Sequence, residues 1–327
     1  MTNVGLWFDV RNPPEWRQDW NRLYGEVLEL CQEADHLGAH SVWLSEHHLF
    51  DDGYLSQPFT LAAAIAARTK SLRIGTAVAL APLRSAAEIA EQSALVDVLS
   101  NGRFELGLGT GYRPPEFKHF DVALERRYAT TDQRVRDVRR LWQDPRVLPP
   151  PVQQRPNIWL GYQGPQGARR AGLLGESLLT VNPESLAPYI AGLKEGGHDP
   201  STARMAGGIN AWISEDPEAD WPVVSERLAY QWDSYRRHAV EGTDTPRPAP
   251  IKPESYRARG LGAALGHFLL ATPQDAATRI DEYLDGIPAQ TIFIWVSIAG
   301  MSYELTQRHM RTIVCELAPL LEGSGTG

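Results

Sequence analysis

The chain has 327 residues, of which 43% are hydrophobic and 22% charged, so it can bury a large core and has the composition of an ordinary globular protein. Its formal net charge of −8 argues against a nucleic-acid-binding protein, because such proteins normally concentrate positive charge on one face. The two cysteines, Cys31 and Cys315, are too few for a disulfide framework, and no apolar run approaches the length of a membrane-spanning helix. The first residues carry no signal-peptide pattern, and we therefore expect a cytoplasmic protein with no membrane or nucleic-acid partner.

Short apolar runs alternate with helical patterns along the chain. The first unit is a strand over residues 4–10 and a helix over 20–37, where apolar residues recur at helical spacing and Gly38 marks the end. The same reasoning predicts further strands, in chain order, over 41–44, 72–79, 104–108, 157–160, 177–181, 206–213 and 291–296. The helices that follow them are predicted over 56–68, 85–99, 126–142, 166–174, 183–195, 221–238 and 302–321.

These eight strand–helix units imply parallel strands joined by helical crossovers. An open, doubly wound sheet would satisfy the alternation, but eight regular units without a break in composition favour a single (β/α)8 TIM barrel of the α/β class over residues 1–327. One stretch, 242–262, is rich in proline, glycine and charge and is too long for an ordinary connector. It is either a surface insertion or a lid over the C-terminal face of the barrel.

Three titratable residues, Glu46, His47 and His48, follow the second predicted strand. Catalytic groups of TIM barrels lie at the C-terminal ends of the strands, and alternation along a strand prevents three neighbours from all entering a core. Because histidine titrates near neutral pH, we interpret the triplet as a catalytic group in which one histidine transfers protons and Glu46 either orients it or is structural. A solvated turn is an alternative. A metal site is another, but no third ligand at a suitable spacing accompanies the pair, and we expect no metal.

Two glycine-rich segments follow later strands. Residues 161–167 precede a short predicted helix, so their backbone N–H groups and the helix N-terminus could cradle a phosphate. Arg169 and Arg170 could add positive charge there, or could simply be solvated. Along the fourth strand, alternating glycines allow either close approach of a flat ring or tight packing between elements: Gly107, Gly109 and Gly111.

Ordered segments spread over most of the chain resemble the luciferase-like monooxygenase family. They are SVWLSEHHLF (41–50), IGTAV (74–78), LRSAAEIAEQSALVDVLSNGRFELGLGTGY (83–112), NIWLGYQGPQGARRAGLLGES (157–177) and TPQDAATRIDEYLDG (272–286). The resemblance implies a homodimeric TIM-barrel oxidoreductase that binds reduced FMN and oxidises a small organic substrate with O2. A separate flavin reductase would supply the reduced flavin, because no G-x-G-x-x-G nicotinamide fingerprint follows any predicted strand. The alternative is the deazaflavin coenzyme of some members, with hydride transfer and no O2; the Glu-His-His order favours FMN.

The resemblance also assigns roles to single residues. His47 matches the histidine that acts near the flavin, with Glu46 and His48 supporting it, and Thr76 and Ala77 fall where the family often has a non-prolyl cis peptide beside the ring. The other matched positions lie near the ring or the phosphate: Gly109, Thr110, Tyr112, Gln163, Gly164 and Gly167. Thr110 departs from the luciferase branch, which has a phosphate-binding arginine there. Four further residues are candidates for a substrate pocket or for the core: Trp212, Trp232, Tyr235 and His267.

Overall fold

Eight parallel strands close into a barrel in the structure, a computed structural model that describes residues 2–253 and 260–323. The order around the barrel is β1 (Asn3–Phe8), β2 (Ser41–Leu44), β3 (Arg73–Thr76), β5 (Phe104–Gly109), β6 (Ile158–Leu160), β7 (Ser177–Leu178), β8 (Met205–Ile209) and β11 (Ala289–Trp295). Strand β11 pairs with β1 and so completes the ring. This arrangement confirms the predicted TIM barrel and brings the C-terminal ends of all eight strands to one face.

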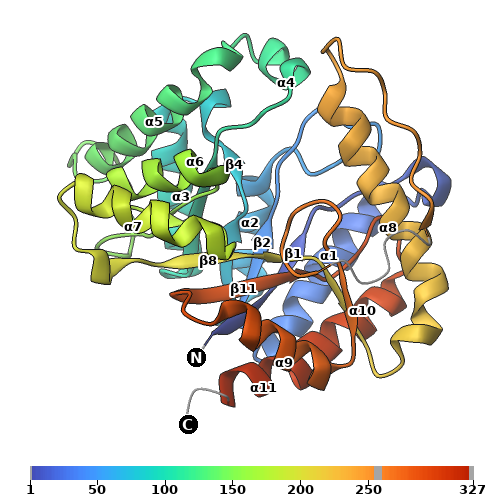
Figure 1. Ribbon diagram of the computed structural model, residues 1–327. Helices are drawn as coiled ribbons and strands as arrows, with labels where there is room; N and C mark the ends of the chain where they lie inside the picture. Colours follow the sequence, from blue (N-terminus) through green and yellow to red (C-terminus); the bar gives the residue numbers. More distant parts are fainter. Residues whose placement is uncertain (1, 254–259, 324–327) are drawn as a thin grey trace.

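Helices surround the barrel and alternate with its strands along the chain (Figure 1). Those that the sequence predicted are α1 (Trp20–His36), α2 (Pro58–Arg68), α3 (Ala86–Ser100), α5 (Arg127–Leu141), α6 (Gly164–Leu173), α7 (Leu186–Glu195), α8 (Pro217–Val240) and α10 (Tyr303–Thr312). The last predicted helix, 302–321, is interrupted: a π-helical turn (Ile313–Leu317) joins α10 to α11 (Ala318–Gly323). Two helices were not predicted, α4 (Pro114–His119) and α9 (Pro273–Leu284).

Side-chain caps explain where several helices begin. The Asp19 carboxylate accepts hydrogen bonds from two backbone N–H groups in the first turn of α1. Ser85 and Glu88 form a capping box at the start of α3, in which each side chain accepts from the other residue's backbone N–H. The cap at Ser85 is the reason why α3 begins next to the position predicted from its apolar spacing.

The predicted strand 206–213 is two strands. After β8 the chain continues as β9 (Ala211–Ile213), which leaves the barrel and pairs with β10 (Leu269–Ala271). Between them, the side-chain oxygen of Asn210 accepts a hydrogen bond from the indole of Trp295, and its Nδ2 donates to the Ala264 carbonyl. The predicted strand 72–79 is also divided, because a cis peptide between Ala77 and Val78 separates β3 from the short strand β4 (Ala79–Leu80).

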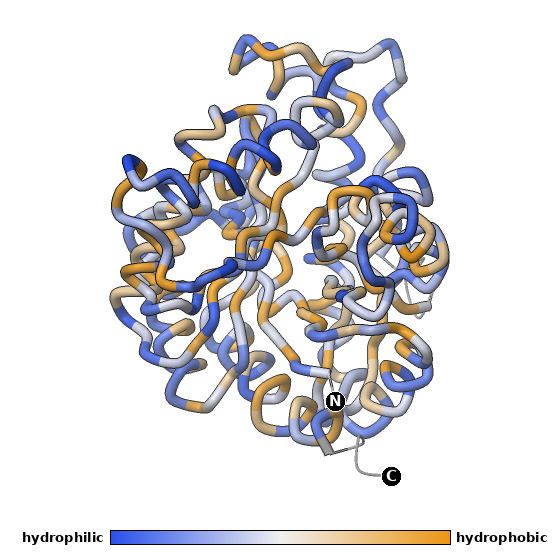
Figure 2. Tube along the Cα trace, turned by 90° about the vertical axis from the view of Figure 1, so that its left-hand side faces the viewer, coloured by the Kyte–Doolittle hydropathy of each residue, from blue (hydrophilic) through white to orange (hydrophobic). Residues whose placement is uncertain are grey.

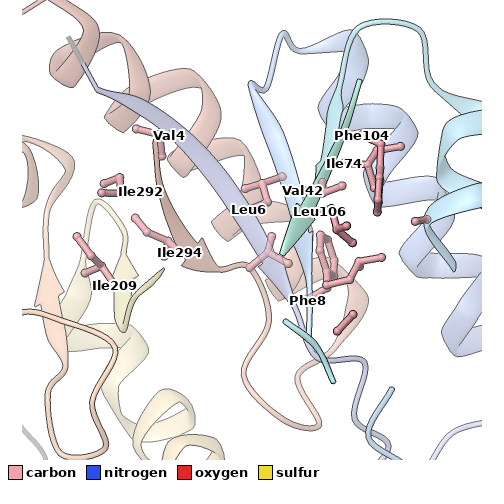
Figure 3. Close-up of a cluster of buried hydrophobic side chains, with 14 of the residues drawn as sticks. Val4, Leu6, Phe8, Val42, Ile74, Phe104, Leu106, Ile209, Ile292 and Ile294 are labelled. Carbon is pink, nitrogen blue, oxygen red and sulfur yellow. The ribbon is translucent and has the colours of Figure 1, made fainter. Parts of the chain in front are cut away.

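The core has two layers. Between the strands and the helices lie aliphatic side chains of the outward-facing positions, such as Val4, Leu6 and Ile292 (Figure 3). Inside the barrel the side chains are aromatic, with the indole of Trp7 stacked on that of Trp295 at 3.7 Å between centroids and Trp43 stacked on Phe293 at 4.9 Å. Along the chain trace, hydrophobic residues concentrate on the central strands and hydrophilic residues on the peripheral helices and loops (Figure 2).

Glycines make room for the indoles inside the barrel. A Cβ on Gly75 would lie 2.4 Å from the Trp43 ring, and a Cβ on Gly208 would lie 2.3 Å from the Trp7 ring. The aromatic filling closes the barrel interior, so a ligand has to bind at the strand ends and not within the barrel.

The stretch predicted as an insertion or lid, 242–262, is described only in part, since residues 254–259 lie outside the described chain. Residues 242–253 follow α8, where Arg236 donates to the Ala249 carbonyl and the Ile251 N–H donates to the Asp233 carboxylate. Residues 260–267 return towards the C-terminal ends of β7 and β8. Among residues 2–253 and 260–323, no helix combines the length and apolarity that crossing a membrane requires.

Candidate active site

His47 lies at the C-terminal face of the barrel, in the turn that follows β2, as predicted. Its backbone N–H donates to the Leu55 carbonyl, which fixes this turn. The imidazole is enclosed by four aromatic rings, whose centroids lie 4.8 to 6.1 Å from its own: Phe50, Tyr54, Tyr112 and Tyr235. The side chain nevertheless keeps 11% of its surface exposed, so one edge of the ring can meet a ligand.

The partner of His47 is Glu116, a residue of α4 that the sequence did not single out. The Nδ1–H of His47 donates to Glu116 Oε1 over 2.9 Å, and the same oxygen accepts from the His48 backbone N–H and from Arg113. Arg113 is fully buried and also donates to the His48 carbonyl and to the Glu241 carboxylate. Because a carboxylate can only accept, the pair fixes the tautomer of His47 and leaves its Nε2 as an acceptor.

Burial sets the charge state of this pair. Burial lowers the pKa of His47, and the hydrogen bond to Glu116 only partly opposes that effect. Burial alone would raise the pKa of Glu116, but the hydrogen bonds from His47 and His48 and the charge of Arg113 hold it below the usual value. Both pKa values are lowered, so near neutral pH His47 is a neutral imidazole and Glu116 a carboxylate.

Glu46 and His48 form a second, separate group. His48 Nε2 donates to Glu46 Oε1 over 2.7 Å, and the Glu46 carboxylate also accepts from Arg84 and from the Leu80 backbone N–H of β4. Glu46 therefore does not orient His47, and of the two roles predicted for Glu46 the structural one is seen. Neighbouring residues of an extended chain point to opposite sides, so Glu46 ties β2 to β4 while the His47 ring turns to Glu116.

The cis peptide between Ala77 and Val78 lies on β3's continuation, beside the end of β2, with the Ala77 N–H donating to the Leu44 carbonyl. The glycines predicted to approach a ring pack here against protein. A Cβ on Gly107 would lie 1.7 Å from the Thr76 carbonyl oxygen, and one on Gly109 would lie 2.2 Å from the Val78 side chain. Of the two roles predicted for these glycines, tight packing between elements is the one seen.

Thr76 and Thr110 form only local contacts. The Thr76 hydroxyl is buried and bonds to both the N–H and the carbonyl of Gly107, and the Thr110 hydroxyl donates to the Gly111 carbonyl. Tyr112 stands beside them with nearly half of its surface exposed. Neither threonine supplies a charge to the barrel face.

Gln163 and Gly164 line a cavity of about 330 Å³ at the C-terminal ends of β6 and β7. Helix α6 begins here without a side-chain cap, so the N–H groups of its first turn have no side-chain partner; Pro165 has no N–H. Gly164 has φ +69°, and a Cβ there would meet nothing within 4 Å, whereas Gly167 packs against Tyr162. Arg169 and Arg170 do not add charge to this cavity, because they pair with Glu195 and Asp132.

The remaining candidates are scattered. Trp212 and Trp232 are fully buried in a separate apolar cluster and belong to the core. Tyr235 joins the aromatic ring set around His47, where its hydroxyl lies 2.8 Å from that of Tyr54. His267 lines the same cavity as Gln163. No group of metal-ligating side chains occurs among the residues that the structure describes.

These residues fit a phosphorylated, extended cofactor. The cavity is within the size range of small-ligand sites, its wall includes an uncapped helix start, and Gly164 at that start has φ +69°, a conformation that favours glycine. His47 lies after β2, on the far side of the ring of strands from β6 and β7. A ligand held at α6 therefore has to extend over the aromatic filling of the barrel to reach His47.

Comparison with known proteins agrees with this geometry. The model of the family described as luciferase-like monooxygenase matches residues 4–290. The oxygenase component of the flavin-dependent trigonelline monooxygenase of Acinetobacter baylyi is 31% identical over 167 residues, 46% of this chain and 46% of that protein. The chain thus spans about half the length, or less, of the curated relatives it matches.

Three solved structures share the fold over almost the whole chain. The monooxygenase RslO1 from Streptomyces bottropensis has a TM-score of 0.79 at 24% identity, covering 97% of this chain and 99% of that one. An F420-dependent secondary alcohol dehydrogenase has a TM-score of 0.73 at 18% identity, covering 98% and 99%. The oxygenating constituent of 3,6-diketocamphane monooxygenase from Pseudomonas putida, in complex with FMN, has a TM-score of 0.72 at 18% identity, covering 97% and 98%.

Proposed function

Since the chain belongs to the luciferase-like monooxygenase family, we propose that it is a flavin-dependent monooxygenase that uses reduced FMN and O2 to oxidise a small organic substrate. One observation carries the proposal: a neutral imidazole, His47, is oriented by Glu116 at the C-terminal face of the barrel and keeps Nε2 as a free acceptor. A relative named as the oxygenase component of a flavin-dependent enzyme supports a separate flavin reductase as the partner.

Each predicted site residue has a part in this proposal. Bound reduced FMN supplies the electrons that activate O2. His47 accepts or returns a proton at Nε2, Glu116 keeps its tautomer, and the aromatic rings around it exclude water. Glu46 and His48 hold the end of β2 against β4. The surface beside the flavin ring is formed by the backbone of Thr76, Ala77, Gly109 and Thr110, with Tyr112 at its edge. The phosphate is bound by Gln163 and by the start of α6, from Gly164 to Gly167.

We further propose that the chain acts as one domain in the cytoplasm and as a homodimer. Helix α3 presents three large apolar side chains to solvent, Leu95, Val98 and Leu99, which are 48%, 38% and 49% exposed. Exposed apolar groups of this kind are typical of a surface covered by another chain. Light scattering on Leu95→Lys should show a monomer, with Leu148→Lys, an exposed site on a loop, as the matched control; a monomeric wild type would remove this part of the proposal.

Titration of the apo-protein with cofactors tests the main proposal. We expect reduced FMN, added without oxygen, to bind with a change in absorbance, and admission of O2 to reoxidise it. His47→Ala should keep the binding but slow turnover of a substrate about 10²–10⁴-fold, the usual loss when a general acid or base is removed; His36→Ala, on the exposed end of α1, is the control.

The second candidate is hydride transfer with coenzyme F420, a deazaflavin. It is favoured by one observation, namely that Thr110 stands without a charge where a phosphate-binding arginine would be expected for FMN. Tight binding of F420 together with no binding of reduced FMN would overturn the monooxygenase proposal and establish this alternative.

A further inference from the structure

The cavity at β6 and β7 is lined in part by the segment from Leu261 to His267. Its other walls are the start of α6, the segment from Leu179 to Ser185 after β7, and Tyr283 of α9. Asn210 holds the segment from Leu261 to His267 in place, since its backbone N–H donates to the Gly262 carbonyl and its side-chain amide donates to the Ala264 carbonyl.

Two polar side chains converge inside this cavity at Gly262. A Cβ built on Gly262 would lie 3.2 Å from Nδ1 of His267 and 3.3 Å from the hydroxyl of Tyr283. In residues 2–253 and 260–323, neither group has a hydrogen-bond partner, and the Gln163 amide, which also lines the cavity, has none either. Three side-chain donors and Gly164, at the start of α6, therefore border one cavity.

The cavity is lined by one residue that can be positively charged and one that can be negatively charged. Of the residues that line it, His267 alone can become a cation, and Glu184 is the one carboxylate. The two arginines of α6 are engaged elsewhere, as described above. The remaining ionisable groups facing the cavity are tyrosines: Tyr283, and Tyr162, whose hydroxyl donates to Asp132.

From these contacts we infer that His267, with Tyr283 and Gln163, binds the terminal phosphate of the cofactor and supplies the positive charge that Thr110 does not. The inference rests on the proposed function. A protonated imidazole beside a phosphate forms a charge-assisted hydrogen bond, which is stronger than a neutral one. The cofactor is then held more tightly when His267 is protonated, and only if it carries a phosphate.

Anaerobic titrations with photoreduced FMN and photoreduced riboflavin, from pH 6 to pH 9, test the inference. We expect His267→Gln to weaken FMN binding about tenfold, a change of 1.4 kcal/mol. The ratio of variant to wild-type Kd cancels the titration of the phosphate itself, which has a pKa near 6. Riboflavin should bind both proteins equally at every pH.

Two further variants sharpen the test. Glu184→Gln removes the negative charge from the same cavity and should tighten FMN binding severalfold, whereas His36→Gln, on the exposed end of α1, should leave the Kd unchanged. A Kd ratio for His267→Gln near one at pH 6 would overturn this inference alone, because FMN would still bind. If neither flavin binds the wild type, both the inference and the proposed function fail.

Discussion

Replacing Glu116 by glutamine removes the charge that faces His47 and keeps the shape of the side chain. We expect the pKa of His47, which burial already lowers, to fall further, because the carboxylate 2.9 Å from Nδ1 is what favours the protonated ring. Two unit charges about 4 Å apart interact by about 4 kcal/mol at an effective dielectric constant of about 20. The glutamine retains a neutral hydrogen bond, so the pKa of His47 should fall by less than the loss of this whole interaction would give.

Proton NMR of the histidine rings measures this shift without knowledge of the substrate. The His47 signal is assigned by its loss in His47→Gln and is then followed with pH in wild type and Glu116→Gln. Glu241→Gln is the matched control, because Glu241 binds the other side of the same arginine, Arg113, with half of its side chain exposed. It should leave the pKa of His47 in place.

The result also has a consequence for activity. If neutral His47 accepts a proton in turnover, the acid limb of the rate–pH profile should move to lower pH in Glu116→Gln by the same amount. A pKa of His47 that stays within about 0.3 units of wild type, or rises, would refute the assignment of Glu116 as the group that positions and charges the site. Should the variant fail to fold, Glu116→Asp keeps the charge at a longer distance and should shift the pKa by less.

Three further predictions concern stability. Gly107→Ala should lower the melting temperature markedly, since its Cβ would lie 1.7 Å from a backbone oxygen, whereas Gly25→Ala in open space on α1 should raise stability by about 0.5–1 kcal/mol. Burial lowers the pKa of His309 to about 3, so the unfolded chain binds its proton first; stability should fall as the pH drops from about 6.5 towards 3, and denaturant titrations should show a flatter pH dependence in His309→Gln. Arg84→Met breaks a buried ion pair and should cost about 3–5 kcal/mol in the free energy of unfolding, against less than about 1 kcal/mol for Arg22→Met, whose side chain is 64% exposed.

The sequence predicted the barrel because each of its strands and most of its helices carry their own periodic signal. It missed α4 because this helix has only six residues and begins with two prolines. It also joined β8 to β9, because both are continuous apolar runs and only the hydrogen bonds of Asn210 show that the chain leaves the barrel there. Tertiary contacts decide which strands pair, and the local sequence pattern does not contain that information.

The same limit explains why the sequence predicted the position of the site but not the hydrogen-bond partners of its residues. Position after β2 was enough to bring Glu46, His47 and His48 to the barrel face. Adjacency in sequence, however, suggested that Glu46 serves His47, and the structure pairs each histidine with a different carboxylate. Glu116 lies 69 residues from His47, and its only sequence signal was its place one short turn beyond the glycine-rich end of β5.

The two carboxylates that bind the histidines of the triplet, Glu46 and Glu116, differ in their contacts and therefore in their roles. The Glu46 carboxylate accepts hydrogen bonds from Arg84, His48 and the backbone of β4. It therefore joins two strands and contributes little to the stabilisation of a reacting proton. Glu116 leaves one oxygen, Oε2, buried and without a hydrogen bond in the described structure, while its other oxygen accepts from His47, from the His48 backbone N–H and from Arg113. An acceptor left unsatisfied in a buried site costs stability, and such a cost at a functional position is consistent with a carboxylate placed in part for its effect on His47.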